Sequence, residues 1–163
     1  MLIISIFFLV IFILFNNFNS ITNDSKYVYP TSYTSISSHY GNRELYGNMN
    51  FHTGIDFLAP MNTEVLASNC GYVEFASFSS DGFGNTIIIS HDNNIKTLYS
   101  HLSENFIVQV GQYVSTGEVI GYIGPKYLSN GILNGNTTGP QLHFSIFVNA
   151  NHINPLEILN QFK

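Results

Sequence analysis

The sequence predicts a mainly β protein, a compact antiparallel β-sheet or sandwich with a short C-terminal helix. Three observations indicate this class. The chain has 163 residues, close to the size of one domain, and 45% of them are apolar, which is enough to form a core. Short runs of β-branched and aromatic residues alternate with clusters of Gly, Asn and Asp. Only the C-terminal tail has a helical pattern.

The expected strands follow one another at short intervals, separated by residues that favour turns. Because Gly and Asn accept positive φ, the segments 81–84 (DGFG) and 91–94 (HDNN) are expected to be hairpin turns. Pro155 suits the first turn of a helix, which is expected over 155–161. The runs expected to form strands are 64–68, 71–77, 85–90, 95–102, 113–114, 119–123 and 142–148.

The first fifteen residues form an almost unbroken apolar run, MLIISIFFLVIFILF. As a helix, residues 2–15 would rise about 21 Å, which is short of the roughly 30 Å hydrocarbon core of a bilayer. Residues 1–20 are therefore expected to be a signal peptide or an N-terminal membrane anchor, and the protein is expected to be exported to the periplasm, cell envelope or medium. Residues 21–35 are expected to form a linker and residues 36–163 the folded domain.

The charge and cysteine content of the chain exclude some kinds of partner and site. The formal net charge is −5 with five basic residues, so no basic patch is available to neutralise several phosphates, and nucleic acid is not an expected partner. Cys70 is the only cysteine, which rules out an internal disulfide and a cysteine-rich metal cluster. Any metal ion has to be held by His, Asp or Glu.

One candidate metal-binding pair lies between residues 51 and 56. His52 and Asp56 are four residues apart, and Gly54 between them favours a turn that leads into a strand. Residues four apart share a face of a helix and also point to the same side of a strand, so either geometry lets the two side chains converge on one ion. A surface hydrogen bond between them is the simpler alternative.

A second histidine is expected on the polar face of a strand near the C-terminus. In residues 141–146, alternation places Leu142 and Phe144 on one face and His143 on the other, together with Gln141. A single histidine in this position is usually a structural residue.

The segment 97–102 repeats this pattern. Alternation places Leu98 and Leu102 on one face and Tyr99 and His101 on the other. Two histidines presented in this way, in addition to a His and Asp pair, favour a shared site over isolated structural histidines.

Taken in order, these segments resemble the lysostaphin and LytM-type zinc endopeptidases, which cut peptide cross-links in bacterial cell walls. The resemblance extends from Ile36 to Glu157, roughly three quarters of the chain. No single segment is decisive, whereas the ordered set is specific. The segments that carry it are 38–43 (SHYGNR), 52–57 (HTGIDF), 59–60 (AP), 82–90, 98–103 (LYSHLS), 110–114 (VGQYV), 117–121 (GEVIG), 138–144 (TGPQLHF) and 154–155 (NP).

The resemblance implies a substrate groove, one Zn²⁺ ion and the peptides of peptidoglycan as substrate. Carried over position by position, it makes His52, Asp56 and His143 the zinc ligands, a set that leaves a fourth position for water as catalytic zinc sites require. His101 matches a catalytic histidine beside the metal that handles a proton or stabilises the oxyanion. Tyr46 matches a catalytic tyrosine that assists the oxyanion in some members.

The chain departs from the family pattern at Gln141, where a catalytic histidine is usual. A glutamine amide can donate a hydrogen bond but cannot exchange a proton near neutral pH, so Gln141 is expected to bind substrate. The first expectation is therefore a zinc-dependent endopeptidase acting on cross-links or stem peptides of peptidoglycan. The alternative is a catalytically impaired module that binds the cell wall or activates a separate amidase.

The connection from Gly124 to Pro140 looks several residues longer than is usual in the family. Such loops border the substrate groove, so the extra length is expected either to alter the choice of substrate or to be a tolerated surface insertion.

Overall fold

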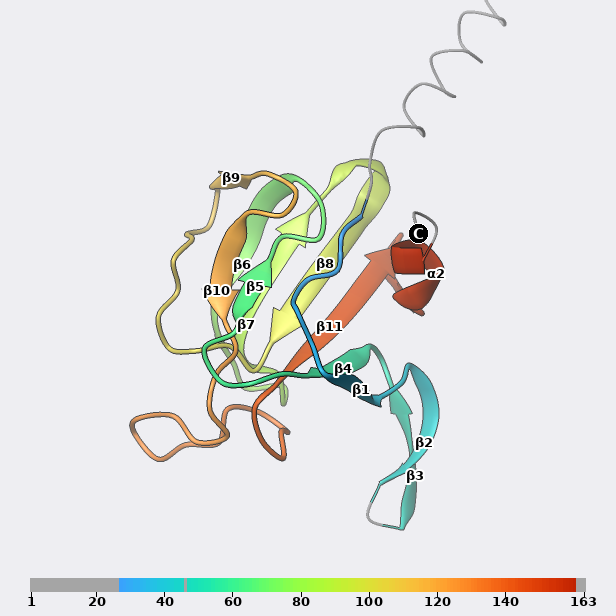
Figure 1. Cartoon of the computed structure of the whole chain (residues 1–163). Helices are drawn as coiled ribbons and strands as arrows, with labels where there is room; N and C mark the ends of the chain where they lie inside the picture. The colour runs from blue at the N-terminus through green and yellow to red at the C-terminus, as the bar shows by residue number, and fades with distance from the viewer. Residues whose placement is uncertain (1–26, 46, 161–163) are drawn as a thin grey trace, which may run out of the picture.

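The fold, given by a computed structural model that describes residues 27–45 and 47–160, is dominated by one large antiparallel sheet (Figure 1). Its strands are β1 (Ser35–Ser38), β4 (Ile55–Leu58), β6 (Gly71–Ser79), β7 (Gly84–Ser90), β8 (Ile95–Ser100), β9 (Tyr113–Val114), β11 (Gln141–Val148) and β12 (Asn151–Ile153). Their order is β1-β4-β11-β8-β7-β6-β9, and β12 pairs with β11. Every pair is antiparallel, which confirms the predicted fold class.

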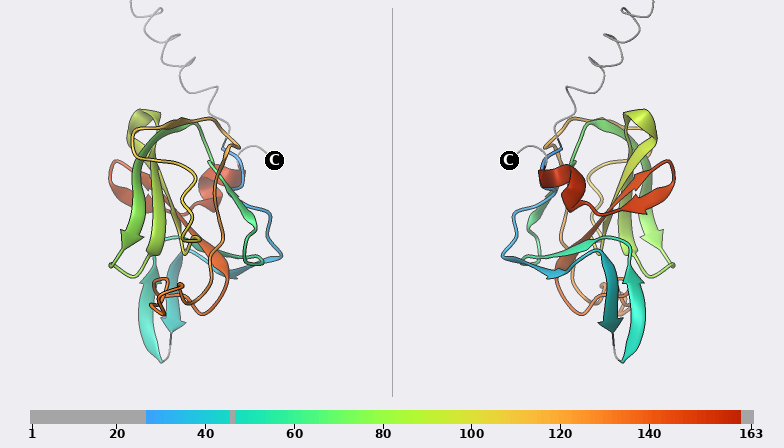
Figure 2. Two further views of the ribbon diagram at one scale, coloured as in Figure 1. Left: turned by 90° about the vertical axis from the view of Figure 1, so that its left-hand side faces the viewer. Right: turned by 90° about the vertical axis from the view of Figure 1, so that its right-hand side faces the viewer.

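Two smaller sheets complete the fold. One pairs β5 (Glu64–Leu66) with β10 (Val119–Tyr122), and the other is a hairpin of β2 (Gly41–Leu45) and β3 (Asn48–His52). The β2–β3 hairpin projects from one end of the molecule, as Figures 1 and 2 show. A short 3-10 helix, η1 (Asp92–Asn94), joins β7 to β8, and the predicted C-terminal helix is confirmed as α2 (Leu156–Leu159).

The core lies between the large sheet and the β5–β10 pair. Val65 of β5 and Ile120 of β10 are fully buried in one cluster with Ile87 of β7 and Phe144 of β11. A Cβ atom added to Gly121 would lie 3.6 Å from the Ile87 side chain, so β10 packs directly on β7. Burying each such aliphatic or aromatic side chain stabilises the fold by about 1.5–3 kcal/mol.

The predicted strands and turns agree with the structure best in the second half of the chain. The predicted runs overlap β5 to β11, and the turns at 81–84 and 91–94 connect β6 to β7 and β7 to β8. Strands β2 and β3 are not among the predicted runs, because they carry Asn, Arg and Glu at exposed positions where β-branched residues favour a strand.

Residues 27–34 lie against the domain before the first strand begins. The amide of Val28 donates to the carbonyl of Ser68 at 2.8 Å, and the amide of Leu66 donates to the carbonyl of Pro30 at 2.7 Å. The signal peptide or anchor predicted over residues 1–20 lies outside the described residues. Within 27–45 and 47–160, no helix is both long and apolar enough to cross a membrane.

A buried histidine links three strands through polar contacts. His91 Nδ1 lies 2.7 Å from the carbonyl oxygen of Cys70, and His91 Nε2 lies 2.8 Å from the hydroxyl of Thr97, which contacts the hydroxyl of Tyr99 at 2.9 Å. Because a carbonyl only accepts, Nδ1 carries the proton. Burial lowers the pKa of His91, so the folded chain holds the neutral imidazole.

This histidine is expected to make the stability of the fold depend on pH. Below a pH of about 6.5 the unfolded chain binds a proton at His91 that the folded chain does not, so the free energy of unfolding decreases as the pH falls, by up to about 1.4 kcal/mol per pH unit. His91→Gln is expected to give a shallower decrease between about pH 7 and pH 5 in urea unfolding. His39→Gln, at an exposed histidine, is the control, and equal slopes for all three chains would contradict the prediction.

Candidate metal centre

The three predicted metal ligands meet at one end of the large sheet. Asp56 of β4 lies opposite His143 of β11 in the strand pairing, and His52 ends β3 just before the turn into β4. A Cβ atom at Gly54 in that turn would collide with the carbonyl oxygen of Phe144, so the close approach of the turn to β11 requires glycine. All three ligand side chains are buried.

The ligand atoms of this cluster have the spacing that a zinc ion needs. His52 Nε2 lies 3.1 Å from Asp56 Oδ1 and 3.0 Å from His143 Nδ1, and His143 Nδ1 lies 2.8 Å from Asp56 Oδ1. In a tetrahedral site with bonds of about 2.0–2.1 Å, ligand atoms lie about 3.3 Å apart. Two imidazoles and one carboxylate are a typical donor set for zinc, so the cluster fits this ion after a shift of a few tenths of an ångström.

The protonation states of Asp56 and His143 are those that bind a cation. Burial raises the pKa of Asp56, but the contacts of its carboxylate with His143 and His52 lower the pKa more, so the net pKa lies well below its usual range. Burial lowers the pKa of His143. A carboxylate and neutral imidazoles are the forms that coordinate a metal ion.

Backbone and hydroxyl groups fix the orientation of both imidazoles. His52 Nδ1 donates to the carbonyl of His39 at 2.9 Å, which leaves Nε2 as the ligand atom. His143 Nε2 lies 3.0 Å from the hydroxyl of Ser145, which itself donates to the carbonyl of Thr53 at 3.0 Å. The serine therefore accepts from His143 Nε2, and Nδ1 is left as the ligand atom.

The carboxylate of Asp56 is oriented by an arginine of the β2–β3 hairpin. Arg43 Nη1 lies 3.4 Å from Asp56 Oδ2 and also donates to the hydroxyl of Ser38. The arginine thus contacts the second carboxylate oxygen, while the first faces the two histidines.

His101 lies beside the cluster, directly after β8. Together with His52 and His143 it lines a cavity of about 250 Å³, and the ring centroids of His101 and His143 are 6.1 Å apart. His101 Nδ1 donates to the carbonyl of Asn134 at 2.8 Å, so Nε2 carries the lone pair. Burial and, to a lesser extent, the proximity of His143 lower the pKa of His101 to about 4, which keeps the ring neutral near pH 7.

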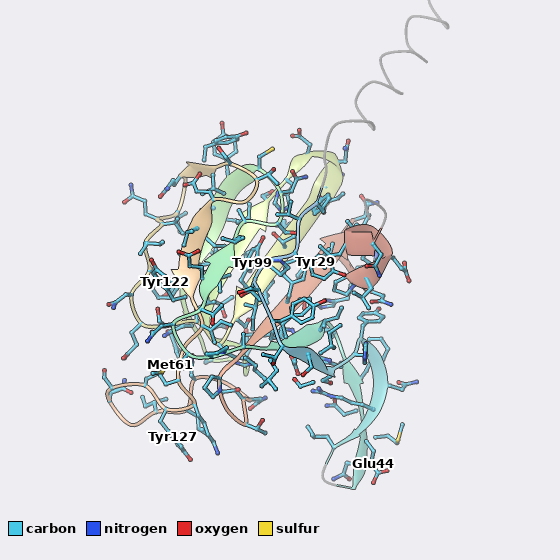
Figure 3. The ribbon with its side chains drawn as sticks, viewed as in Figure 1. Tyr29, Glu44, Met61, Tyr99, Tyr122 and Tyr127 are labelled. Carbon is cyan, nitrogen blue, oxygen red and sulfur yellow. The ribbon has the colours of Figure 1, made fainter. Side chains whose placement is uncertain are left out.

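The predicted alternation over 97–102 is wrong for Tyr99. This side chain, labelled in Figure 3, belongs to the core. It is fully buried, and its ring centroid lies 5.3 Å from that of Phe144. His101 has a φ of 62°, in the left-handed region, so the backbone turns there after the strand has ended. This turn brings His101 to the side of the cluster while Leu102 enters the core. A strict period of two assumes an unbroken strand and misses this turn.

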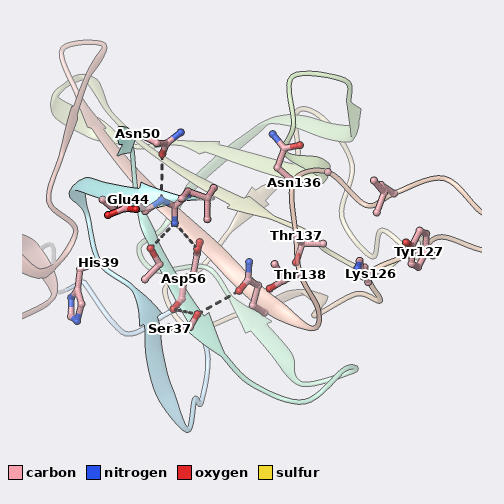
Figure 4. Close-up of a pocket in the computed structure, with 16 residues that line it drawn as sticks. Ser37, His39, Glu44, Asn50, Asp56, Lys126, Tyr127, Asn136, Thr137 and Thr138 are labelled. Carbon is pink, nitrogen blue, oxygen red and sulfur yellow. Dashed lines mark hydrogen bonds and ion pairs between the residues drawn. The ribbon is translucent and has the colours of Figure 1, made fainter. Parts of the chain in front are cut away.

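A larger groove adjoins the cluster, and Figure 4 shows its lining. Its volume is about 820 Å³, and Asp56 and Gln141 are among the residues that line it. One side is formed by residues 43–45 and 50 of the β2–β3 hairpin, and the other, called here the loop wall, is formed by Lys126, Tyr127, Leu133 and residues 135–138. The long connection between β10 and β11 therefore borders the groove.

Of the two remaining predicted site residues, the structure describes one. Gln141 starts β11, points to the same face as His143 and lines the groove, where its Oε1 accepts from the hydroxyl of Ser37 at 3.4 Å. Tyr46 lies outside the described residues.

Sequence reasoning missed Asn134, which is fully buried in the β10–β11 connection. Its Oδ1 accepts from the amide of Asn85 at 2.9 Å, and its Nδ2 donates to the carbonyls of Leu102 at 2.9 Å and Pro125 at 3.1 Å. Its own carbonyl accepts from His101. In the sequence, Asn134 lies in the Gly- and Asn-rich stretch NGILNGN, where nothing marks it as different from a solvent-exposed turn residue.

Asn134→Ala is expected to lower the free energy of unfolding by about 2–4 kcal/mol, because the amide of Asn85 and the carbonyls of Leu102 and Pro125 each lose a hydrogen bond to this side chain. Urea unfolding measures this change. Asn130→Ala is the matched control in the same loop, because Asn130 is exposed and accepts only from the amide of Ile132, at 3.0 Å. Equal effects of the two substitutions would contradict the anchoring role of Asn134.

Comparison with known proteins identifies the family. The pattern of "Peptidase family M23" matches residues 50–155. The DD-carboxypeptidase/endopeptidase Mpg of Neisseria meningitidis is 38% identical over 131 residues, which are 79% of this chain and 28% of the relative. This chain thus spans under a third of the length of the curated relatives it matches first.

Solved structures show the same fold. The catalytic domain of lysostaphin from Staphylococcus simulans is similar with a TM-score of 0.66 and 30% identity, over 78% of this chain and 92% of that domain. A zinc-containing peptidase from Vibrio cholerae has a TM-score of 0.67 and 28% identity, over 79% of this chain and 39% of that one. The family pattern covers most of the chain and the architecture agrees, so this protein belongs to peptidase family M23, which confirms the resemblance read from the sequence.

Proposed function

We propose that the chain is a zinc-dependent endopeptidase that hydrolyses cross-links or stem peptides of bacterial peptidoglycan. The observation that carries the proposal is the convergence of His52 Nε2, Asp56 Oδ1 and His143 Nδ1, at mutual distances of 2.8–3.1 Å, beside a groove large enough for a peptide. Membership of a peptidase family and the names of the relatives support the reaction class and the substrate.

His52, Asp56 and His143 would hold one Zn²⁺ ion. A bound zinc ion polarises a peptide carbonyl and lowers the pKa of a bound water toward about 7. The second ring nitrogen of each imidazole is hydrogen-bonded to the chain itself, in His52 to the carbonyl of His39 and in His143 to the hydroxyl of Ser145. These bonds keep both ligand nitrogens unprotonated and directed toward one point.

His101 is the proposed proton-transfer residue. Its Nδ1 proton is committed to the carbonyl of Asn134, so its Nε2 lone pair can accept a proton from an attacking water. The ring then carries a positive charge that stabilises a neighbouring oxyanion. Tyr46 is proposed to assist the oxyanion.

Gln141 is proposed to bind the substrate backbone. Its Oε1 lies 3.4 Å from the hydroxyl of Ser37, which also lies 3.2 Å from the carbonyl of Asp56, and its NH₂ group can donate to a peptide carbonyl in the groove. Proton transfer is therefore assigned to His101, and Gln141 is assigned to positioning.

The substrate also sets where the protein acts. Peptidoglycan lies outside the cytoplasmic membrane, so the proposal includes export, with residues 1–20 as a signal peptide or as an anchor to the membrane. The relatives that act on peptidoglycan are consistent with this location.

The function is tested by incubating the zinc-loaded chain with purified peptidoglycan and identifying the soluble fragments by mass spectrometry. We expect fragments with newly formed peptide termini, their loss on adding a chelator, and their return when zinc is restored. A folded, zinc-loaded chain that releases no fragments would reject the proposal.

The glutamine at position 141 supports a second candidate, an impaired module that binds the cell wall or activates a separate amidase. If His101 carries the proton transfer, Gln141→His is expected to change the rate of fragment release less than about tenfold. If the missing histidine has disabled the chain, the same substitution is expected to raise the rate by about 10²- to 10⁴-fold. The rate, measured at equal zinc content, thus separates the two candidates.

A further inference from the structure

The loop wall of the groove carries a cation that pairs with no carboxylate of the described residues. Among residues 27–45 and 47–160 there are three Lys or Arg residues. Arg43 contacts Asp56, and Lys96 Nζ lies 2.6 Å from Glu74 Oε1. Within these same ranges no carboxylate lies within ion-pair distance of Lys126, whose Nζ instead lies 5.3 Å from the centroid of the Tyr127 ring. The charge of Lys126 is therefore available to a ligand.

The backbone that carries Lys126 is fixed in place. The carbonyl of Lys126 accepts from the amide of Asn134 at 2.9 Å, and Tyr127 forms a β-bridge with Leu133. Asn134 is itself tied to three backbone groups of the domain. The lysine is half-buried and is one of the residues that line the groove.

The carboxylates that line the groove lie away from the loop wall. Among the described lining residues they are Asp56 of β4 and Glu44 of the β2–β3 hairpin, and the hairpin side also carries Arg43, which is paired with Asp56. Figure 4 shows Glu44 on one side and Lys126 with Tyr127 on the other, and Figure 3 shows Glu44 and Tyr127 on separate projections at the same end of the molecule. The loop wall thus presents a positive charge together with the amide and hydroxyl groups of Asn136 and Thr138.

We propose that the loop wall is a subsite for a carboxylate carried by the peptide ligand, and that Lys126 determines this specificity. An ammonium group and neutral donors on a fixed loop are complementary to a carboxylate, and the Tyr127 ring restricts the position of the ammonium group. The inference rests on the proposed function for its peptide ligand and deepens it, because it names the charge that this peptide carries. The carboxylate is either the C-terminal one or that of an acidic side chain.

The test measures peptide affinity by isothermal titration calorimetry, using the zinc-loaded full chain with His101→Ala so that turnover does not consume the peptide. Two pairs of short stem-type peptides are compared. One pair ends in a free carboxylate or in an amide, and the other pair, amidated at its end, carries Glu or Gln in its side chain. We expect one of the acidic peptides to bind more tightly than its neutral partner, and the pair that differs identifies the source of the carboxylate.

Lys126→Gln, made in the same chain, is expected to weaken binding of that acidic peptide by about three- to tenfold and to leave the neutral peptide within about twofold. Lys96→Gln is the matched control, because Lys96 pairs with Glu74 outside the groove, and it is expected to change neither affinity. Lys126→Arg is expected to restore the preference. Circular dichroism verifies that each variant is folded.

The subsite is overturned if the parent chain binds acidic and neutral peptides equally, if Lys126→Gln weakens both to the same extent, or if no peptide binds. The proposed function is judged separately, by fragment release from peptidoglycan with the wild-type chain. If the chain prefers the acidic peptide but releases no fragments, the subsite is supported and the endopeptidase function is rejected. If the chain releases fragments but does not prefer the acidic peptide, the endopeptidase function is supported and the subsite is rejected.

Discussion

His143→Ala is expected to abolish stoichiometric zinc binding and, with it, the release of peptidoglycan fragments. The substitution removes the nitrogen that lies 2.8 Å from Asp56 Oδ1 and 3.0 Å from His52 Nε2, so one imidazole and one carboxylate remain. Loss of a direct ligand is expected to weaken zinc binding by more than the roughly 10- to 100-fold typical of losing an outer contact. Zinc content after gel filtration, measured by mass spectrometry of the metal, gives the result.

Two further variants calibrate this measurement. Ser145→Ala removes the hydroxyl that accepts from His143 Nε2, so zinc affinity is expected to fall by about 10- to 100-fold without losing a ligand. His39→Ala keeps the backbone carbonyl that accepts from His52 and removes only an exposed ring, so full zinc content is expected. Normal zinc content in a folded His143→Ala chain would refute the ligand assignment.

His101→Ala is expected to keep the zinc and to lower kcat by about 10²- to 10⁴-fold. The side chain lines the cavity beside the cluster but bonds through Nδ1 to Asn134, so its removal leaves all three ligands in place. Without the neutral imidazole, whose pKa is lowered to about 4 by burial, the chain loses its proposed proton acceptor.

The informative readout is kcat, KM and zinc content measured on the same sample. A fall in kcat with unchanged zinc content supports proton transfer by His101, and a KM within about threefold shows that the groove still binds the peptide. A kcat close to that of the wild type would show that another group transfers the proton. Loss of zinc together with activity would instead make His101 part of the metal site.

The central strands were predictable because they are short runs of β-branched and aromatic residues between turn residues. In β11 the period of two also placed Phe144 correctly on the core face. The β2–β3 hairpin was not predictable in this way, because it is stabilised by cross-strand pairing of polar residues such as Arg43 and Asn50, not by an apolar face. Its position beside the cluster depends on the contact of Arg43 with Asp56, which belongs to a different sheet.

The candidate site was also predictable only in part. The residue types and order of His52, Asp56 and His143 were visible in the sequence, and strand pairing brings them together. The position of His101 depends on a left-handed backbone conformation that alternation cannot express. The role of Asn134 depends on bonds to residues far away along the chain, so local composition carried no signal for it.

The attachment of the β10–β11 connection at Asn134 divides this segment into two independent parts. Residues 126–133 form a tip that is closed by the bond from Asn134 to Lys126 and by the bridge between Tyr127 and Leu133. His101 bonds to this connection outside the tip: its Nδ1 donates to the carbonyl of Asn134, and its own carbonyl accepts from the amide of Gly124 at 2.9 Å. The tip can therefore be exchanged for a segment of different length or charge without moving the histidine, which makes it a natural grafting point for engineering new ligand preferences into this scaffold.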